Sequence, residues 1–74
     1  MYCKSINIIC YTVSPEDGNG YIMCHIKTIQ NTHWYKIIDK DKAFYTILVE
    51  GKPMIVSKKC VKTISDEEYM IEEL

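Results

Sequence analysis

Residues 44–64, with the sequence FYTILVEGKPMIVSKKCVKTI, decide the fold of this 74-residue chain. Two runs rich in β-branched and aromatic residues flank Glu50-Gly51-Lys52, and such runs favour strands. Gly51 can adopt the positive φ angle that a tight turn between two strands requires. Pro53 has no N–H to donate to a neighbouring strand, so it belongs at a strand start or a sheet edge. The stretch therefore predicts a β-hairpin, a short helical turn over residues 57–60 and a last strand.

Four groups of residues within this stretch form a pattern that is typical of one family. They are an aromatic-Tyr-x-Ile group at residues 44–47, Gly51-Lys52, Ile55-Val56 and Val61-Lys62. In this order and without a gap, they resemble the C-terminal half of bacterial Src-homology-3-like domains. Eukaryotic members carry a Pro-Ser-Asn-Tyr-Val segment, ending in a single helical turn, where this chain has SKKCV at residues 57–61. The resemblance implies a small β-barrel.

The residues that help eukaryotic members to bind proline-rich peptides are not found in this chain. The Pro and Tyr that line their polyproline groove correspond to Ser57 and Cys60 here. An acidic-tyrosine opening motif is not present either, and only residues 6–8 echo the opening strand of the family. The resemblance thus supports the barrel and argues against recognition of PxxP segments.

The rest of the chain reads as short strands joined by turns. Residues 6–13, 21–29 and 33–38 have strand-forming runs, and turn formers fill residues 14–20. A chain of this length forms one domain. The predicted fold is all-β: a small Src-homology-3-like barrel of five or six antiparallel strands over residues 1–64, followed by an acidic helix or tail over residues 65–74.

The C-terminal segment has the signals of a short helix. Ser65, followed three residues later by Glu68, forms a capping box, and acidic residues suit the positive end of a helix dipole. Such a short helix is marginal on its own. We therefore expect Met70, Ile71 and Leu74 to pack on the barrel.

Charge is divided between the body and this segment. Residues 1–64 hold nine lysines against five acidic residues, which gives +4, whereas residues 65–74 hold five acidic residues and no base, which gives −5. The chain has no arginine, so the bidentate fork that reads guanine or phosphate is not available. The lysines of this basic body include a cluster near the final turn, which is one candidate site. The alternatives are that the cluster is a solvated face or that the acidic tail packs on it. Its members are Lys52, Lys58, Lys59 and Lys62.

A second candidate site follows from the alternation along the predicted strands. In residues 21–29, one alternate set holds no charge (Ile22, Cys24, Ile26, Thr28), so we expect it to face inward. The other set would then face solvent, beside the outward residues of the next strand. This predicts an aromatic patch of interface-like composition that binds a partner; the alternative is that Trp34 packs in the core under the C-terminal helix. The patch consists of Tyr21, Met23, His25, Trp34 and Lys36.

Metal, cofactor and catalytic sites are not predicted. The four cysteines and two histidines occur in neither C-x-x-C nor H-x-x-x-H spacing. Cys24 and His25 are neighbours on a strand, so their side chains point to opposite faces. The sequence has neither a glycine-rich phosphate loop nor a nucleophile elbow.

The N-terminus lacks the features of a signal peptide, and no stretch is long and apolar enough to span a membrane. We expect a cytoplasmic chain with reduced thiols. These patterns predict a small non-enzymatic module that binds another protein, such as a phage-type inhibitor or regulator of a host protein. A homodimer is left open, and the alternative function is nucleic-acid binding through lysines and exposed aromatic side chains.

Overall fold

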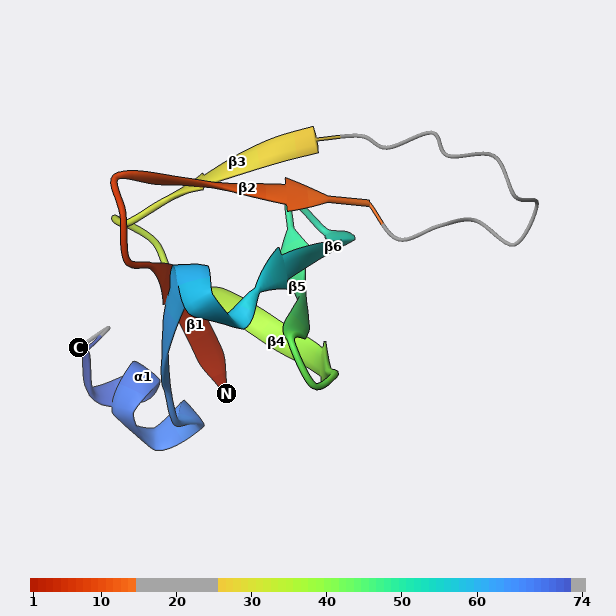
Figure 1. Ribbon diagram of the computed structural model, residues 1–74. Helices are drawn as coiled ribbons and strands as arrows, with labels where there is room; N and C mark the ends of the chain where they lie inside the picture. The colour runs from red at the N-terminus through yellow and green to blue at the C-terminus, as the bar shows by residue number, and fades with distance from the viewer. Residues whose placement is uncertain (15–25, 73–74) are drawn as a thin grey trace.

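The computed structural model describes residues 1–14 and 26–72. Within these residues the chain forms seven strands, one 3-10 helix and one α-helix, and Figure 1 labels β1 to β6 and α1. Their bounds are β1 (Tyr2–Ser5), β2 (Ile9–Val13), β3 (Ile26–Gln30), β4 (Tyr35–Lys40), β5 (Phe44–Val49), β6 (Lys52–Ser57), η1 (Lys58–Cys60), β7 (Val61–Ile64) and α1 (Asp66–Glu72).

The strands form one curled antiparallel sheet in the order β3-β2-β6-β5-β4-β1-β7. Figure 1 shows β2 and β3 crossing over β5 and β6 at one end, while β1, β7 and α1 lie at the other. The curl gives the sheet an inner face, which holds the core, and an outer face. The all-β, barrel-like prediction with a short C-terminal helix is confirmed.

The hairpin that decides the fold forms as predicted. β5 and β6 pair up to Val49 and Lys52, which leaves a two-residue turn of Glu50 (φ 53°) and Gly51 (φ 79°). Both φ angles are positive, as in the turns that match the twist of β-hairpins. A Cβ added at Gly51 would meet no atom within 4 Å, so a side chain there would cost only backbone strain.

The N-terminal part differs from the prediction of one strand over residues 6–13. A bend at residues 6–8 separates β1 from β2. The Ser5 hydroxyl donates to the Asn7 carbonyl at 2.7 Å, and the Ile6 N–H donates to the Cys60 carbonyl at 3.0 Å. Because of this bend, β1 pairs with β4 and β7, whereas β2 pairs with β3 and β6. The described part of the sheet therefore has seven strands, not five or six.

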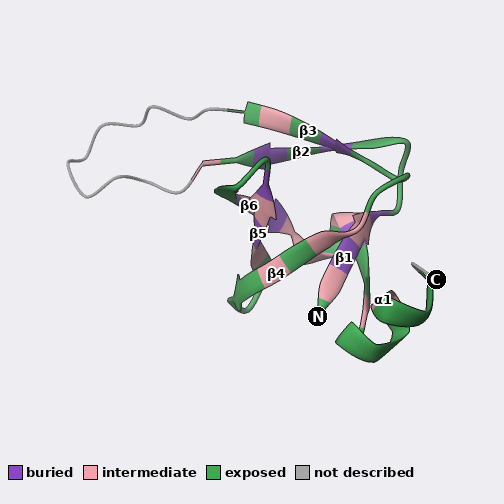
Figure 2. Ribbon diagram, turned by 180° about the vertical axis from the view of Figure 1, so that it is seen from behind, coloured by how far each residue is buried: buried purple, intermediate pink, exposed green. Residues whose placement is uncertain are grey.

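The core lies on the inner face and draws on both ends of the sheet, as the buried segments in Figure 2 show. Thr12 is fully buried, and its hydroxyl donates to the Lys27 carbonyl at 3.0 Å, so no polar group is left unpaired there. The buried apolar residues are Cys3, Cys10, Ile29, Ile47, Val49, Met54, Val56 and Val61.

The facing of β3 is opposite to the prediction. Ile29 is fully buried, whereas Ile26 is 63% exposed and Thr28 is also exposed. The expectation placed the charged Lys27 outside, but its long stem lies half-buried while its ammonium group reaches Glu50 at 2.7 Å. That contact lowers the pKa of the Glu50 carboxyl, through the hydrogen bond first and the charge second. Ile22 and Cys24 lie outside the described residues.

The C-terminal helix begins as predicted, with the Ser65 hydroxyl accepting from the Glu68 N–H at 3.2 Å. Its packing differs, because Met70 and Ile71 are 69% and 70% exposed. Tyr69 packs instead: its ring stacks on Tyr2 with centroids 3.7 Å apart and planes 9° apart. The expectation that Met70 and Ile71 pack on the barrel is therefore wrong, and Leu74 lies outside the described residues.

Candidate functional site

The outer face of β4, β1 and β7 gathers lysines and aromatic residues, and we call it the basic face. Lys4 lies opposite Lys62, and Tyr2 lies opposite Lys36 in the register of the sheet. Because side chains alternate along a strand, these residues point away from the buried Cys3. The basic face consists of Tyr2, Lys4, Trp34, Lys36 and Lys62.

Trp34 is the centre of this face. The ammonium groups of Lys4 and Lys62 lie 4.4 and 5.9 Å from its ring centroid. Each such cation–π contact contributes on the order of 0.5 kcal/mol at an exposed site. The indole N–H donates to a Glu72 carboxylate oxygen at 2.7 Å. One half-buried indole thus joins two strands to the C-terminal helix.

Three contacts hold helix α1 on the sheet, and two of them are with the basic face. In addition to the bond from Trp34 to Glu72, Tyr69 stacks on Tyr2, and the N-terminal ammonium pairs with Asp66. Figure 1 shows α1 beside the N-terminal end of β1. The acidic segment therefore docks on the basic body, and it does so through polar and aromatic contacts.

The aromatic patch predicted from the sequence is described only in part. Residues 21–25, with Tyr21, Met23 and His25, lie outside the described residues. Trp34 lies directly before β4 and is half-buried, and Lys36 is exposed on β4. Tyr35 and Ile37, which alternate with these two residues, pack against the core, so the outward facing expected for Lys36 is confirmed.

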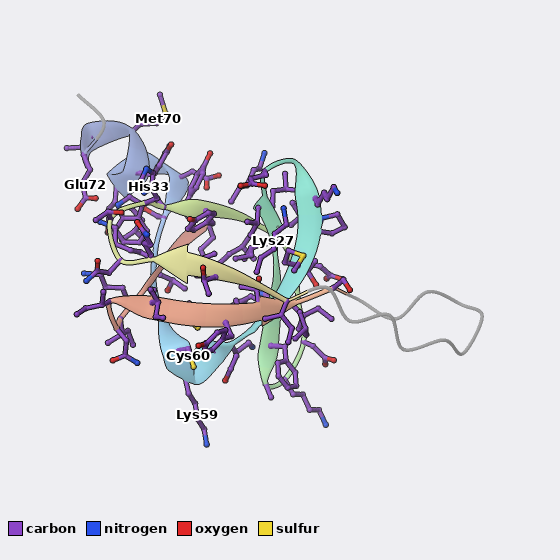
Figure 3. The ribbon with its side chains drawn as sticks, turned by 90° about the horizontal axis from the view of Figure 1, so that it is seen from above. Lys27, His33, Lys59, Cys60, Met70 and Glu72 are labelled. Atoms are coloured by element: carbon purple, nitrogen blue, oxygen red, sulfur yellow. The ribbon has the colours of Figure 1, made fainter. Side chains whose placement is uncertain are left out.

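The lysines predicted as one basic cluster are separated in the structure. Lys52 begins β6, whereas Lys58 and Lys59 follow its other end, roughly 20 Å away for six residues of strand. The Lys58 ammonium lies 5.0 Å from the Tyr45 ring centroid, and Figure 3 shows Lys59 pointing away from the molecule. Lys62 belongs to the basic face. The sequence could not group Lys62 with Lys4, because their contact depends on the pairing of the first strand with the last.

A second surface, missed by the sequence reasoning, is the outer side of β2 and β3. We call it the apolar face; it consists of Ile9, Tyr11, Val13, Ile26, Thr28 and Gln30, which carry no charge. Tyr11 is 66% exposed, and Val13 lies opposite Ile26. β3 ends the described sheet, so one of its edges has no partner strand there. In the sequence, the alternation of Ile9 and Tyr11 with Cys10 could have indicated this face. It was missed because β3 was predicted to turn Ile26 and Thr28 inward.

The thiols of Cys3 and Cys10 are buried in the core and have little nucleophilic character. Burial, and then the charge of Cys10, raises the pKa of Cys3 to about 12. Burial, and then a hydrogen bond with Cys60, raises the pKa of Cys10 to about 11. Thiols with such pKa values stay protonated near neutral pH and react slowly.

Other chemistry on the described residues is sparse. In residues 1–14 and 26–72, no three His, Cys, Asp or Glu side chains lie close enough together to hold a metal ion. His33 is exposed and its Nδ1 lies 2.8 Å from the Thr32 hydroxyl. None of the described helices has the length and apolar character needed to cross a membrane.

Comparison with known proteins adds no relatives: no family model, curated protein or solved structure matches this chain.

Proposed function

We propose that this chain is a small, non-enzymatic module that binds another protein through its apolar face. The supporting observation is that six neighbouring outward positions on β2 and β3 carry no charge and include the exposed Tyr11 and Ile26. The central part of a protein interface is typically poor in charge and rich in aromatic and apolar side chains. Contiguous exposed apolar patches on small proteins often mark such interfaces.

The composition of this face favours a protein over a nucleic acid. Binding of nucleic acid depends on cations that neutralise phosphates, and none of the six positions carries one. Thr28, Gln30 and the Tyr11 hydroxyl can supply hydrogen bonds around an apolar centre. The face therefore suits a partner surface that is itself apolar and uncharged.

We propose that the partner presents an extended segment that adds to β3. Strand β3 has a partner strand on one side only in the described sheet, so its other side offers backbone groups for pairing. An added strand would extend the apolar face with its own alternate side chains, as in β-augmentation. Cytoplasmic location is part of this proposal and fits the free thiols of Cys3, Cys10 and Cys60. The phage-type inhibitor role and the relationship to Src-homology-3-like domains stay predictions.

The test compares two lysine substitutions in exposed apolar positions. Tyr11→Lys places a charge in the apolar face, whereas Phe44→Lys places one at a 48% exposed position on β5. Proteins captured by the wild type should be lost with Tyr11→Lys and retained with Phe44→Lys. With the purified partner, Tyr11→Ala should weaken binding about 30-fold or more if Tyr11 is a hot spot.

Two results would contradict the proposal. One is a partner whose affinity is unchanged by Tyr11→Lys in a protein that circular dichroism shows to be folded. The other is self-association of the purified chain that Tyr11→Lys abolishes, because the occupant would then be a second copy. Sedimentation of the wild type and both variants decides the second point.

A further inference from the structure

We propose that the basic face is a second binding site, that its ligand is an acidic helical segment of a partner protein, and that α1 occupies it in the free chain. This inference goes beyond the proposed function and does not depend on it, because the basic face and the apolar face share no residue. It accounts for contacts that the apolar face does not involve.

The chemistry of the basic face calls for an anionic partner. Three of its five residues are lysines, none is acidic, and Lys4 and Lys62 are direct cross-strand neighbours. Like charges placed opposite each other destabilise a sheet unless something compensates them. The carboxylate of Glu72 reaches the edge of Trp34, whose ring both lysines approach. The carboxylate of an occupant therefore lies beside the indole that both lysines approach and adds negative charge near them.

Helix α1 shows which features an occupant needs. Tyr69 stacks on Tyr2, and Glu72, three residues later and on the same side of the helix, accepts from the Trp34 indole. Figure 3 shows Met70 pointing away from the sheet. The occupant is thus recognised by an aromatic residue followed three positions later by an acid on a helix.

Helix α1 is held in a way that permits displacement. It has only seven residues, Asp66–Glu72, and none of them is buried. Helices this short are marginal without apolar packing, and Met70 and Ile71 are exposed. Only Ser65 separates β7 from α1, so the helix competes at the high effective concentration of a tethered group. A partner helix with the same two contacts and further apolar contacts would displace it.

The contacts favour a protein segment over single-stranded nucleic acid. A base would have to stack on the Trp34 ring, and the Lys4 ammonium already lies over that ring at 4.4 Å. The second aromatic residue of the face, Tyr2, accepts the ring of a tyrosine on a helix in parallel stacking. The occupant seen in the structure is a peptide helix.

The test uses the full chain and an acetylated synthetic peptide, SDEEYMIEEL, which copies residues 65–74. Trp34 is the only tryptophan, so its indole N–H resonance reports on the site without assignment of other signals. An opened variant carries Tyr69→Ala and Glu72→Ala. A matched control carries Glu67→Ala and Met70→Ala, which alter the same helix at exposed positions.

The opened variant should bind the peptide at least ten-fold more tightly than the wild type or the control does. A peptide with alanine at the positions of Tyr69 and Glu72 should not shift the indole resonance. Adding Tyr11→Lys to the opened variant should leave peptide binding unchanged, which separates this site from the apolar face. Glu72→Gln alone is a milder variant, should the double substitution impair folding, and it should strengthen binding by a smaller factor.

Two outcomes would overturn the inference. Equal or undetectable peptide binding by the opened variant and the wild type would mean that the basic face does not recognise such a segment. Binding of a twelve-residue oligothymidylate, with a steep loss of affinity in salt and without peptide binding, would assign the face to nucleic acid.

Discussion

The two outer faces of this sheet share one core but differ in what covers them. The basic face carries three lysines and is partly covered by α1, whereas the apolar face carries no charge and its Tyr11 is 66% exposed. Burial of apolar surface yields roughly 25 cal/mol per Å², so hydrophobicity alone would direct the helix to the apolar face. The helix lies instead beside the strand that it directly follows. The short connection at Ser65 and the contacts of Tyr69 and Glu72 hold it there.

A helix that buries little apolar surface can still be held in one orientation on the sheet. Helix α1 leaves Met70 and Ile71 exposed and contacts the sheet through Tyr69, Glu72 and Asp66. Directional contacts hold the helix in one orientation with little buried area. The four predictions below test the contrast between the two faces, from the largest expected effect to the smallest.

The largest effect should come from the side of β3 opposite to the apolar face, which packs in the core. Ile29→Ala removes a fully buried side chain of β3 and should lower the free energy of unfolding by about 2–5 kcal/mol. Ile26→Ala, on the same strand but 63% exposed, should change it by less than about 0.5 kcal/mol. Urea unfolding measures both, and similar losses for the two variants would contradict the facing of β3.

The second prediction concerns the core between the two faces, where Cys3 on β1 and Cys10 on β2 lie. Both pKa values are raised above the ordinary 9.0, so the folded state keeps thiol protons that the unfolded state loses as pH rises. This stabilisation is complete about one pH unit or more below 9.0 and is lost as the pH rises toward the folded-state values of about 11 and 12. When the pH is raised from 8 to 9.5, ionisation of the two thiols in the unfolded state should lower the free energy of unfolding, measured by urea unfolding, by about 1.5 kcal/mol.

The control for the thiol effect is Cys3→Ala, because lysines and tyrosines also titrate in alkaline solution. This variant should show about half of the pH-dependent loss between pH 8 and 9.5. An unchanged pH dependence would mean that Cys3 does not contribute to it.

A third, smaller effect should separate two neighbouring residues of α1. Tyr69→Ala removes the stack on Tyr2 and should cost about 1 kcal/mol. Met70→Ala alters a 69% exposed side chain and should leave the thermal midpoint unchanged. Equal midpoints for the two variants would show that the helix is not held through Tyr69.

The smallest effect should distinguish two lysines of the basic face. Lys4→Met keeps the length of the side chain but removes the ammonium over Trp34, and should cost about 0.5 kcal/mol. Lys36→Met, at an exposed position on β4, should have no measurable effect. Unfolding followed by the fluorescence of the single tryptophan measures both, and an equal loss for Lys36→Met would count against the contact between Lys4 and Trp34.

Much of the local structure could be predicted from the sequence. The hairpin turn at Glu50 and Gly51, the 3-10 turn of η1 and the start of α1 at Ser65 lie where the residues indicate. These features depend on backbone preferences and capping bonds between residues a few positions apart. The facing of β3 was predicted wrongly because the charged Lys27 was assumed to point to solvent. Its apolar stem lies half-buried instead, and its ammonium group reaches Glu50.

By itself, the sequence determined the all-β class, the central hairpin, and the division into a basic body and an acidic helix, because these follow from composition and short-range preferences. Only the tertiary structure decided which residues meet. The bend at residues 6–8 sends β1 to β7 and β2 to β6, and this brings Lys4 and Lys62 to Trp34 and leaves Tyr11 beside Ile26. Such pairings join positions far apart in the chain, and they are selected by the packing of one shared core rather than by any local pattern.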